Sequence, residues 1–182
     1  MSPDRPRRVL VAGIGNVFLG DDGFGVEVVR RVDAAELPAT VDVADYGIRG
    51  VHLAYELLDG RHDTLIMVDA VPLDGPPGTL AVLDVGDAAA DADGLGAPVV
   101  DGHGMDPLTV LRLLRHLGGA VDRALVVGCR PETVDERMGL SRPVADAVPE
   151  AVRLVTAVAR EEAARAEAAR PDTTGEGVRA DA

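Results

Sequence analysis

The sequence predicts one α/β domain, a three-layer α/β/α sandwich on a five-stranded mixed, mostly parallel sheet. Short aliphatic runs alternate with helical patterns along 182 residues, a length that suits a single domain. Residues 64–68 form a nearly continuous apolar run, as expected of a central parallel strand covered on both faces. Hydrophobic residues make up 47% of the chain and aromatic residues only 2%, which predicts an aliphatic core.

The first half of the chain predicts three strands separated by two helices. The aliphatic run 8–12 is typical of a strand, and the apolar periodicity of 26–32 indicates a helix. Residues 41–46 alternate with period two and predict a second strand, and 51–58 a short helix. The third strand is the run 64–68.

The fourth strand should run against the others. The turn-rich connector 72–78 is too short for the helical crossover that two parallel strands need. The strand at 79–84 should therefore be antiparallel to the third and finish at the opposite edge of the sheet. The long stretch 86–104 has no periodicity, and its length would carry the chain back to the edge where the parallel strands end.

The remaining elements complete the sandwich. Asp106 before Pro107 is a strong helix start, and Ser141 is placed to cap the last helix. The sequence after residue 106 predicts a helix over 108–117, a strand over 123–128 and a helix over 142–166. We expect one domain over residues 1–166 and a disordered polar tail over 167–182.

Composition narrows the functional class. The net charge of −13 argues against nucleic acid as a partner. The single cysteine, Cys129, excludes internal disulfides and cysteine-rich zinc sites and fits a reducing, cytoplasmic setting. Arginines precede an apolar run over 9–19, as in a signal peptide, but glycines interrupt it and acidic residues follow, so we expect no export. No run approaches the ~20 apolar residues of a membrane span.

A glycine-rich loop joins the first strand to the first helix and carries the strongest functional signal. It resembles a dinucleotide-binding fingerprint, but Phe18 stands where the third glycine should be. Asp21 and Asp22 at the start of the helix would also repel a pyrophosphate. We therefore expect the loop to present a carboxylate to a cation. The alternative is a helix cap, and we expect one of the two aspartates to fill that role and leave the other free.

Three side chains should converge on the edge where the parallel strands end. Asp69 directly follows the buried strand, where a carboxylate is costly unless it is paired, ligated or capping backbone. His103 ends the long return segment. Asp22, Asp69 and His103 would leave open positions on a divalent metal whose identity the ligands do not settle. The alternative is three unrelated polar residues around a cleft.

At these residues the sequence resembles a known family, the hydrogenase maturation endopeptidases. The resemblance extends from Val9 to about Val158. Its motifs are the loop region 9–26, the strand 63–71, the histidine segment 101–105, and the C-terminal signature over 128–132 and 138–141.

The resemblance implies a function and a set of roles. Asp22, Asp69 and His103 would be the catalytic and metal-contacting residues. The substrate would be the precursor of a nickel–iron hydrogenase large subunit, trimmed at its C-terminus. We expect nickel to arrive with this substrate, because two carboxylates and one imidazole would hold it only modestly. A non-catalytic nickel-site chaperone or docking module would use the same residues and stays open. So does the choice between an aspartate and the metal as activator of water.

Two stretches near the expected substrate cleft depart from the family pattern. The family often has Asp-Gly-Gly-Thr after the second strand, where residues 45–48 read Asp-Tyr-Gly-Ile. The residues around the histidine are Gly102 and Gly104 in place of the more usual polar side chains. Cys129 matches a commonly aliphatic position, so we expect a buried small hydrophobe there and not a nucleophile.

Overall fold

The computed structural model describes residues 5–86 and 106–169. In chain order the elements are β1 (Val9–Ile14), η1 (Gly20–Gly23), α1 (Phe24–Val29), η2 (Ala34–Glu36), β2 (Val41–Gly47), α2 (Gly50–Leu57), β3 (Thr64–Ala70), β4 (Leu80–Asp84), α4 (Pro107–His116), β5 (Arg123–Cys129) and α5 (Arg142–Ala168).

The five strands form one mixed sheet in the order β2-β1-β3-β5-β4. β1 pairs in parallel with β2 and β3, and β3 pairs in parallel with β5. β4 pairs with β5 and runs antiparallel to it, as the short connector before it predicts. The four parallel strands therefore all end at one edge of the sheet.

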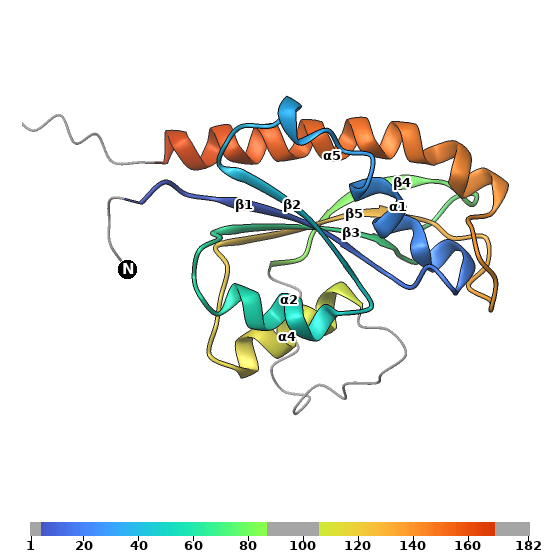
Figure 1. The fold of residues 1–182 in the computed structure, drawn as a ribbon, viewed down its shortest axis with the longest axis horizontal. Coiled ribbons are helices and arrows are strands. Elements are labelled where there is room, and N and C mark those ends of the chain that lie inside the picture. The colour runs from blue at the N-terminus through green and yellow to red at the C-terminus, as the bar shows by residue number, and fades with distance from the viewer. Residues whose placement is uncertain (1–4, 87–105, 170–182) are drawn as a thin grey trace, which may run out of the picture.

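Helices cover both faces of this sheet, which confirms the three-layer sandwich. Figure 1 shows α1 and α5 on one face and α2 and α4 on the other. The side chains of β3 alternate between two hydrophobic clusters. Leu65 and Met67 belong to the cluster on the α2/α4 side, and Ile66 and Val68 to that on the α1/α5 side. The central strand is therefore buried on both faces.

The glycines of the first loop allow α1 to pack closely on the strand ends. A Cβ on Gly25 would lie 2.0 Å from the carbonyl oxygen of Val68 and 2.4 Å from that of Ile14. A Cβ on Gly13 would lie 2.4 Å from Cγ2 of Val29. These glycines are needed for backbone approach between helix and sheet, which accounts for them without a bound phosphate.

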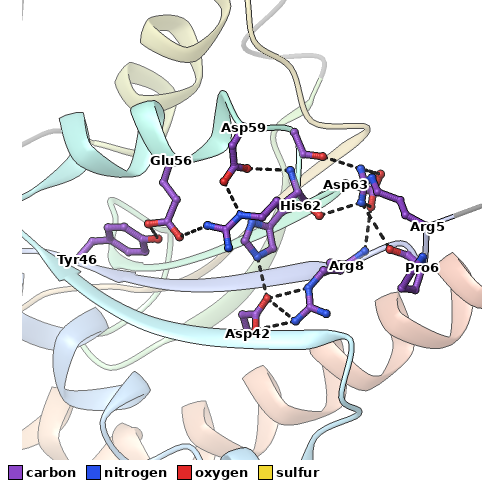
Figure 2. A network of polar contacts seen from close by, with 11 residues as sticks. Arg5, Pro6, Arg8, Asp42, Tyr46, Glu56, Asp59, His62 and Asp63 are labelled. Atoms are coloured by element: carbon purple, nitrogen blue, oxygen red, sulfur yellow. Dashed lines mark hydrogen bonds and ion pairs between the residues drawn. The ribbon is translucent and has the colours of Figure 1, made fainter. Parts of the chain in front are cut away.

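A polar network ties the chain together at the opposite edge, where the parallel strands begin (Figure 2). The Arg5 guanidinium donates to both carboxylate oxygens of Asp63, at 3.1 and 2.8 Å. Arg8 pairs with Asp42 at 2.8 Å, and Nε2 of buried His62 lies 2.8 Å from the same carboxylate. The network joins the segment before β1 to the start of β2 and the loop before β3. It has a structural role at a distance from the strand C-termini.

Element boundaries differ slightly from the prediction. α1 ends at Val29 instead of Val32, and α5 continues to Ala168 instead of Ala166. The α1 shift is the larger of the two, since residues 30–31 form a turn after the helix, and terminal turns of a helix depend on tertiary contacts. Within the described ranges no helix has the length and apolar character needed to cross a membrane.

Candidate active site

A cavity of about 150 Å³ opens at the edge where the parallel strands end. Its lining residues come from the glycine loop, the end of β2, the end of β3 and the start of α4: Gly15, Asn16, Asp22, Gly47, Ile48, Gly50, Asp69, Ala70 and Asp106. The structure thus brings Asp22 and Asp69 to one cavity, as predicted. His103 lies outside the described residues.

Asp69 is the most deeply buried acid of the cavity, at 5% exposure. Its Oδ1 accepts a hydrogen bond of 2.8 Å from the Ala70 N–H, which is its one donor within the described chain. Burial, followed by the negative charges of Asp22 and Asp106, raises the pKa of Asp69 well above its usual value. The backbone contact expected of a capping aspartate is therefore present. That single contact does not compensate the cost of burying a charge, so the Asp69 side chain favours its protonated form when no cation is beside it.

Asp22 lies in η1 and is held by the loop that precedes it. The Asn16 N–H donates to its Oδ2 at 2.6 Å. Gly15 has a φ of 124°, and a Cβ there would lie 1.8 Å from the Asp22 carbonyl oxygen, so the loop closes on Asp22 only with glycine at this position. Burial raises the pKa of Asp22 although the Asn16 bond opposes the shift. Its carboxylate is thus oriented by one backbone donor and faces the cavity.

Asp21 has a different, structural role. It is fully buried, and its oxygens accept hydrogen bonds from Glu132 N (2.8 Å), Thr133 N (3.1 Å), Ser141 N (2.6 Å) and Ser141 Oγ (2.8 Å). Burial opposes its ionisation, but these bonds, first those from Ser141, outweigh burial and lower the pKa of Asp21. Asp21 therefore joins the glycine loop to the segment that leads into α5.

Two capping predictions are wrong. Neither Asp21 nor Asp22 caps the helix, since no side chain caps η1 or α1. Ser141 occupies the N-cap position of α5, but its side chain makes no capping bond, because its hydroxyl donates to Asp21. One aspartate is structural and the other lines the cavity, as expected. The hydrogen bonds of the structural one, Asp21, come from a distant segment of the chain and not from the helix that it precedes.

Asp106 is a member of the cavity that the sequence indicated only as a helix cap. It does cap α4, accepting from Leu108 N at 2.9 Å and Thr109 N at 3.0 Å. It also lines the cavity, and its charge adds to the raised pKa of Asp69. The chain has therefore returned to this edge by residue 106, as the long segment before it predicts. The available signal was its position three residues after His103 in the sequence.

Comparison with known proteins decides the family. The family model for HycI, the hydrogenase maturation proteases, matches residues 26–158. The chain belongs to this family.

Relatives and solved structures agree with this assignment. A putative hydrogenase maturation protease of Methanocaldococcus jannaschii is 32% identical over 154 residues, covering 83% of this chain and 96% of the relative. The hydrogenase 2 maturation protease of Escherichia coli is 31% identical over 156 residues, covering 85% and 92%. The structure of the Escherichia coli endopeptidase HybD matches with a TM-score of 0.65 at 29% identity, covering 85% and 93%. A hydrogenase 2 maturation peptidase from a Thaumarchaeota archaeon matches at 0.60 and 34%, covering 84% and 97%.

The chain is thus an endopeptidase with the α/β fold of the hydrogenase maturation proteases. In this endopeptidase, no group of three or more His, Cys, Asp or Glu within residues 5–86 and 106–169 is close enough to hold a metal ion. Asp106 does not complete a ligand set with Asp22 and Asp69. The described residues present a pair of carboxylates, and further ligands would have to come from His103 or from a bound molecule. Hard carboxylate oxygens and an imidazole are compatible with a divalent ion.

Cys129 has the buried position predicted for it. It ends β5 and packs in the hydrophobic cluster on the α1/α5 side. Burial, and then the charge of Asp21, raises the pKa of the Cys129 thiol to about 11, so the thiol is protonated at neutral pH. A thiolate nucleophile would need the opposite shift, so this cysteine is a core residue of the endopeptidase.

Proposed function

We propose that this endopeptidase removes the C-terminal extension from the nickel-loaded precursor of a nickel–iron hydrogenase large subunit. The observation that carries the proposal is the pairing of Asp22 and Asp69 in one cavity at the end of the central strands. Asp69 is buried there with one backbone donor and no cationic partner among the described residues. Binding of a cation carried by the substrate would compensate this charge.

In this proposal nickel belongs to the substrate. Thiolates of the precursor hold the ion, and Asp22, Asp69 and His103 complete its coordination from the enzyme side. Thiolates are the stronger ligands, so the ion stays with the precursor and the enzyme needs no permanent metal. Nickel next to the scissile bond supplies Lewis-acid polarisation.

The protein's own contribution is orientation and proton transfer. The Asn16 N–H holds Oδ2 of Asp22, and Oδ1, which has no donor within the described chain, can accept a proton from water in the cavity. The wall at Gly15 and Gly47 has no side chains, which allows a peptide backbone to approach these carboxylates closely. We place the reaction in the cytoplasm, a compartment that the single cysteine fits. The partner is the precursor. The net charge of −13 argues against nucleic acid, and we propose no membrane partner.

The test mixes metal-stripped enzyme with nickel-loaded and nickel-free precursor in parallel, with mass spectrometry of both products. We expect one cleavage near the C-terminus of the loaded precursor and an intact nickel-free precursor, because the empty form lacks the contact with the carboxylates. Equal cleavage of the two forms would contradict the role of substrate nickel. Binding of the loaded precursor without any loss of its tail would identify a chaperone instead.

The same assay tests the three site residues. Asp22→Ala, Asp69→Ala and His103→Ala should each lower the cleavage rate by at least about a hundredfold with native circular dichroism. Asp122→Ala is the matched control, since this exposed aspartate pairs with Arg7 on the surface at 2.8 Å and should leave the rate unchanged. A site variant that folds and still processes the precursor at the wild-type rate shows that its residue is not in the site.

A further inference from the structure

A second hollow of about 330 Å³ adjoins the catalytic cavity. The two share Gly15, Asn16, Gly47 and Ile48 as a common wall. From this wall the second hollow, here called the side groove, continues past Phe18 and the end of β2 to Arg30 of the α1 C-terminus. A peptide chain whose scissile bond lies in the cavity can therefore continue directly into the side groove.

Two large apolar side chains are exposed along the side groove. Phe18 is 62% exposed and Ile48 is 64% exposed, although the chain has only two phenylalanines and the other, Phe24, is fully buried. Phe18 sits on a constrained backbone, because its N–H donates to Asn16 Oδ1 and its carbonyl oxygen accepts from Arg137 N, both at 3.0 Å. Exposed apolar side chains that line a hollow mark a surface for a partner.

The side groove also carries a positive charge that no carboxylate neutralises within the described chain. Arg49 donates through Nε to the Tyr46 carbonyl oxygen at 3.2 Å and through Nη2 to that of Asp45 at 2.9 Å. Both acceptors are neutral. The other arginine of the groove, Arg30, is paired with the Asp45 carboxylate at 2.8 Å. On a chain with a net charge of −13, an uncompensated guanidinium favours a negatively charged ligand.

We infer that the side groove binds the precursor segment next to the scissile bond, with an apolar side chain between Phe18 and Ile48 and a carboxylate at Arg49. The inference rests on the proposed function and adds the substrate determinants. We choose the precursor as the ligand of the side groove because the groove and the cavity are continuous: they share lining residues, so a peptide can extend from one into the other.

The test measures steady-state cleavage of the nickel-loaded precursor by Phe18→Ser and Ile48→Thr. Each variant should raise KM about tenfold and leave kcat within about twofold, because the lost contact binds the substrate before and during the reaction alike. Val82→Ser is the matched control. Val82 is 41% exposed on β4, at the other side of the sheet from β2, and its change should leave KM unchanged. Melting temperatures of all variants report on folding.

A second arm tests the charge. KM of the wild type should rise with ionic strength, and Arg49→Gln should raise KM at low salt and remove most of that dependence. A precursor in which the apolar residue beside the scissile bond is replaced by serine should show the same KM for wild type and Phe18→Ser.

The outcomes separate this inference from the proposed function. If the wild type leaves the loaded precursor intact, the proposed function fails. If the wild type cleaves it and folded Phe18→Ser and Ile48→Thr do so with wild-type KM, the side groove is not the substrate subsite and the function stands. An unchanged salt dependence in Arg49→Gln overturns the carboxylate contact. A change in oligomeric state with unchanged KM would assign the groove to contact with a second copy of the chain and overturn the inference.

Discussion

Asp21 and Asp22 are neighbours in the sequence with opposite electrostatic environments. Asp21 is ionised within four hydrogen bonds, and its pKa is lowered. Asp22 has one backbone donor, faces the cavity and has a raised pKa. A charge held by several donors stabilises the fold, whereas a partly desolvated charge with one donor does not. The stabilities of matched variants should therefore differ.

Asp21→Asn should lower the free energy of unfolding by about 3 kcal/mol, because an amide cannot accept all four bonds and brings its own N–H groups against donors. Asp22→Asn should stay within about 1 kcal/mol of the wild type, since its amide oxygen can still accept from Asn16. Urea denaturation measures both. Under conditions in which both variants are folded, cleavage assays should show the opposite order of effects: Asp22→Asn should be inactive. Equal destabilisation by the two changes would refute the division of roles.

At the scale of elements, the site depends on how closely α1 approaches the sheet. The loop that positions Asp22 is anchored at one end by β1 and at the other by α1. The helix reaches the carbonyl oxygens of Ile14 and Val68 only because Gly25 has no side chain. Packing of α1 on the strand ends therefore determines where the Asp22 carboxylate lies.

Gly25→Ala should lower the free energy of unfolding by about 3 kcal/mol or more, because its Cβ would overlap two backbone oxygens that cannot move away. The residual folded protein should also cleave more slowly, since the glycine loop must shift. Gly86→Ala is the control: among the described residues its Cβ would meet only an Asp84 oxygen, at an ordinary 3.5 Å. We expect that control within about 1 kcal/mol of the wild type. Similar losses for both substitutions, measured by thermal or urea unfolding, would show that close approach at Gly25 is not the cause.

At the scale of the whole molecule, the sheet separates structure from chemistry. The arginine, aspartate and histidine network of Figure 2 closes the edge where the parallel strands begin. The cavity and the side groove lie at the edge where they end. α5 covers the face between, and its buried side chains extend to Ala166. The described core and both hollows therefore lie before the end of this helix.

A chain that ends at Arg170 should retain full cleavage activity and a melting temperature within about 2 °C of the full chain, since the polar composition of residues 171–182 offers no apolar face for packing. Differential scanning calorimetry and the precursor assay measure the two properties. A clear drop in either would show that the last residues dock on the domain.

The sequence by itself determined the sandwich and the meeting of two site residues, Asp22 and Asp69. Hydrophobic periodicity is a local property, so it predicted the five strands, and the short connector before β4 predicted its reversed direction. Because parallel strands end at one edge, the sequence also placed Asp22 and Asp69 together. Only the tertiary structure decided the rest. The partners of Asp21 lie 111 to 120 residues away in the chain, so no local capping rule could find them. Asp106 enters the cavity, and Phe18, Ile48 and Arg49 form one groove, through packing between distant segments, which periodicity and spacing do not encode.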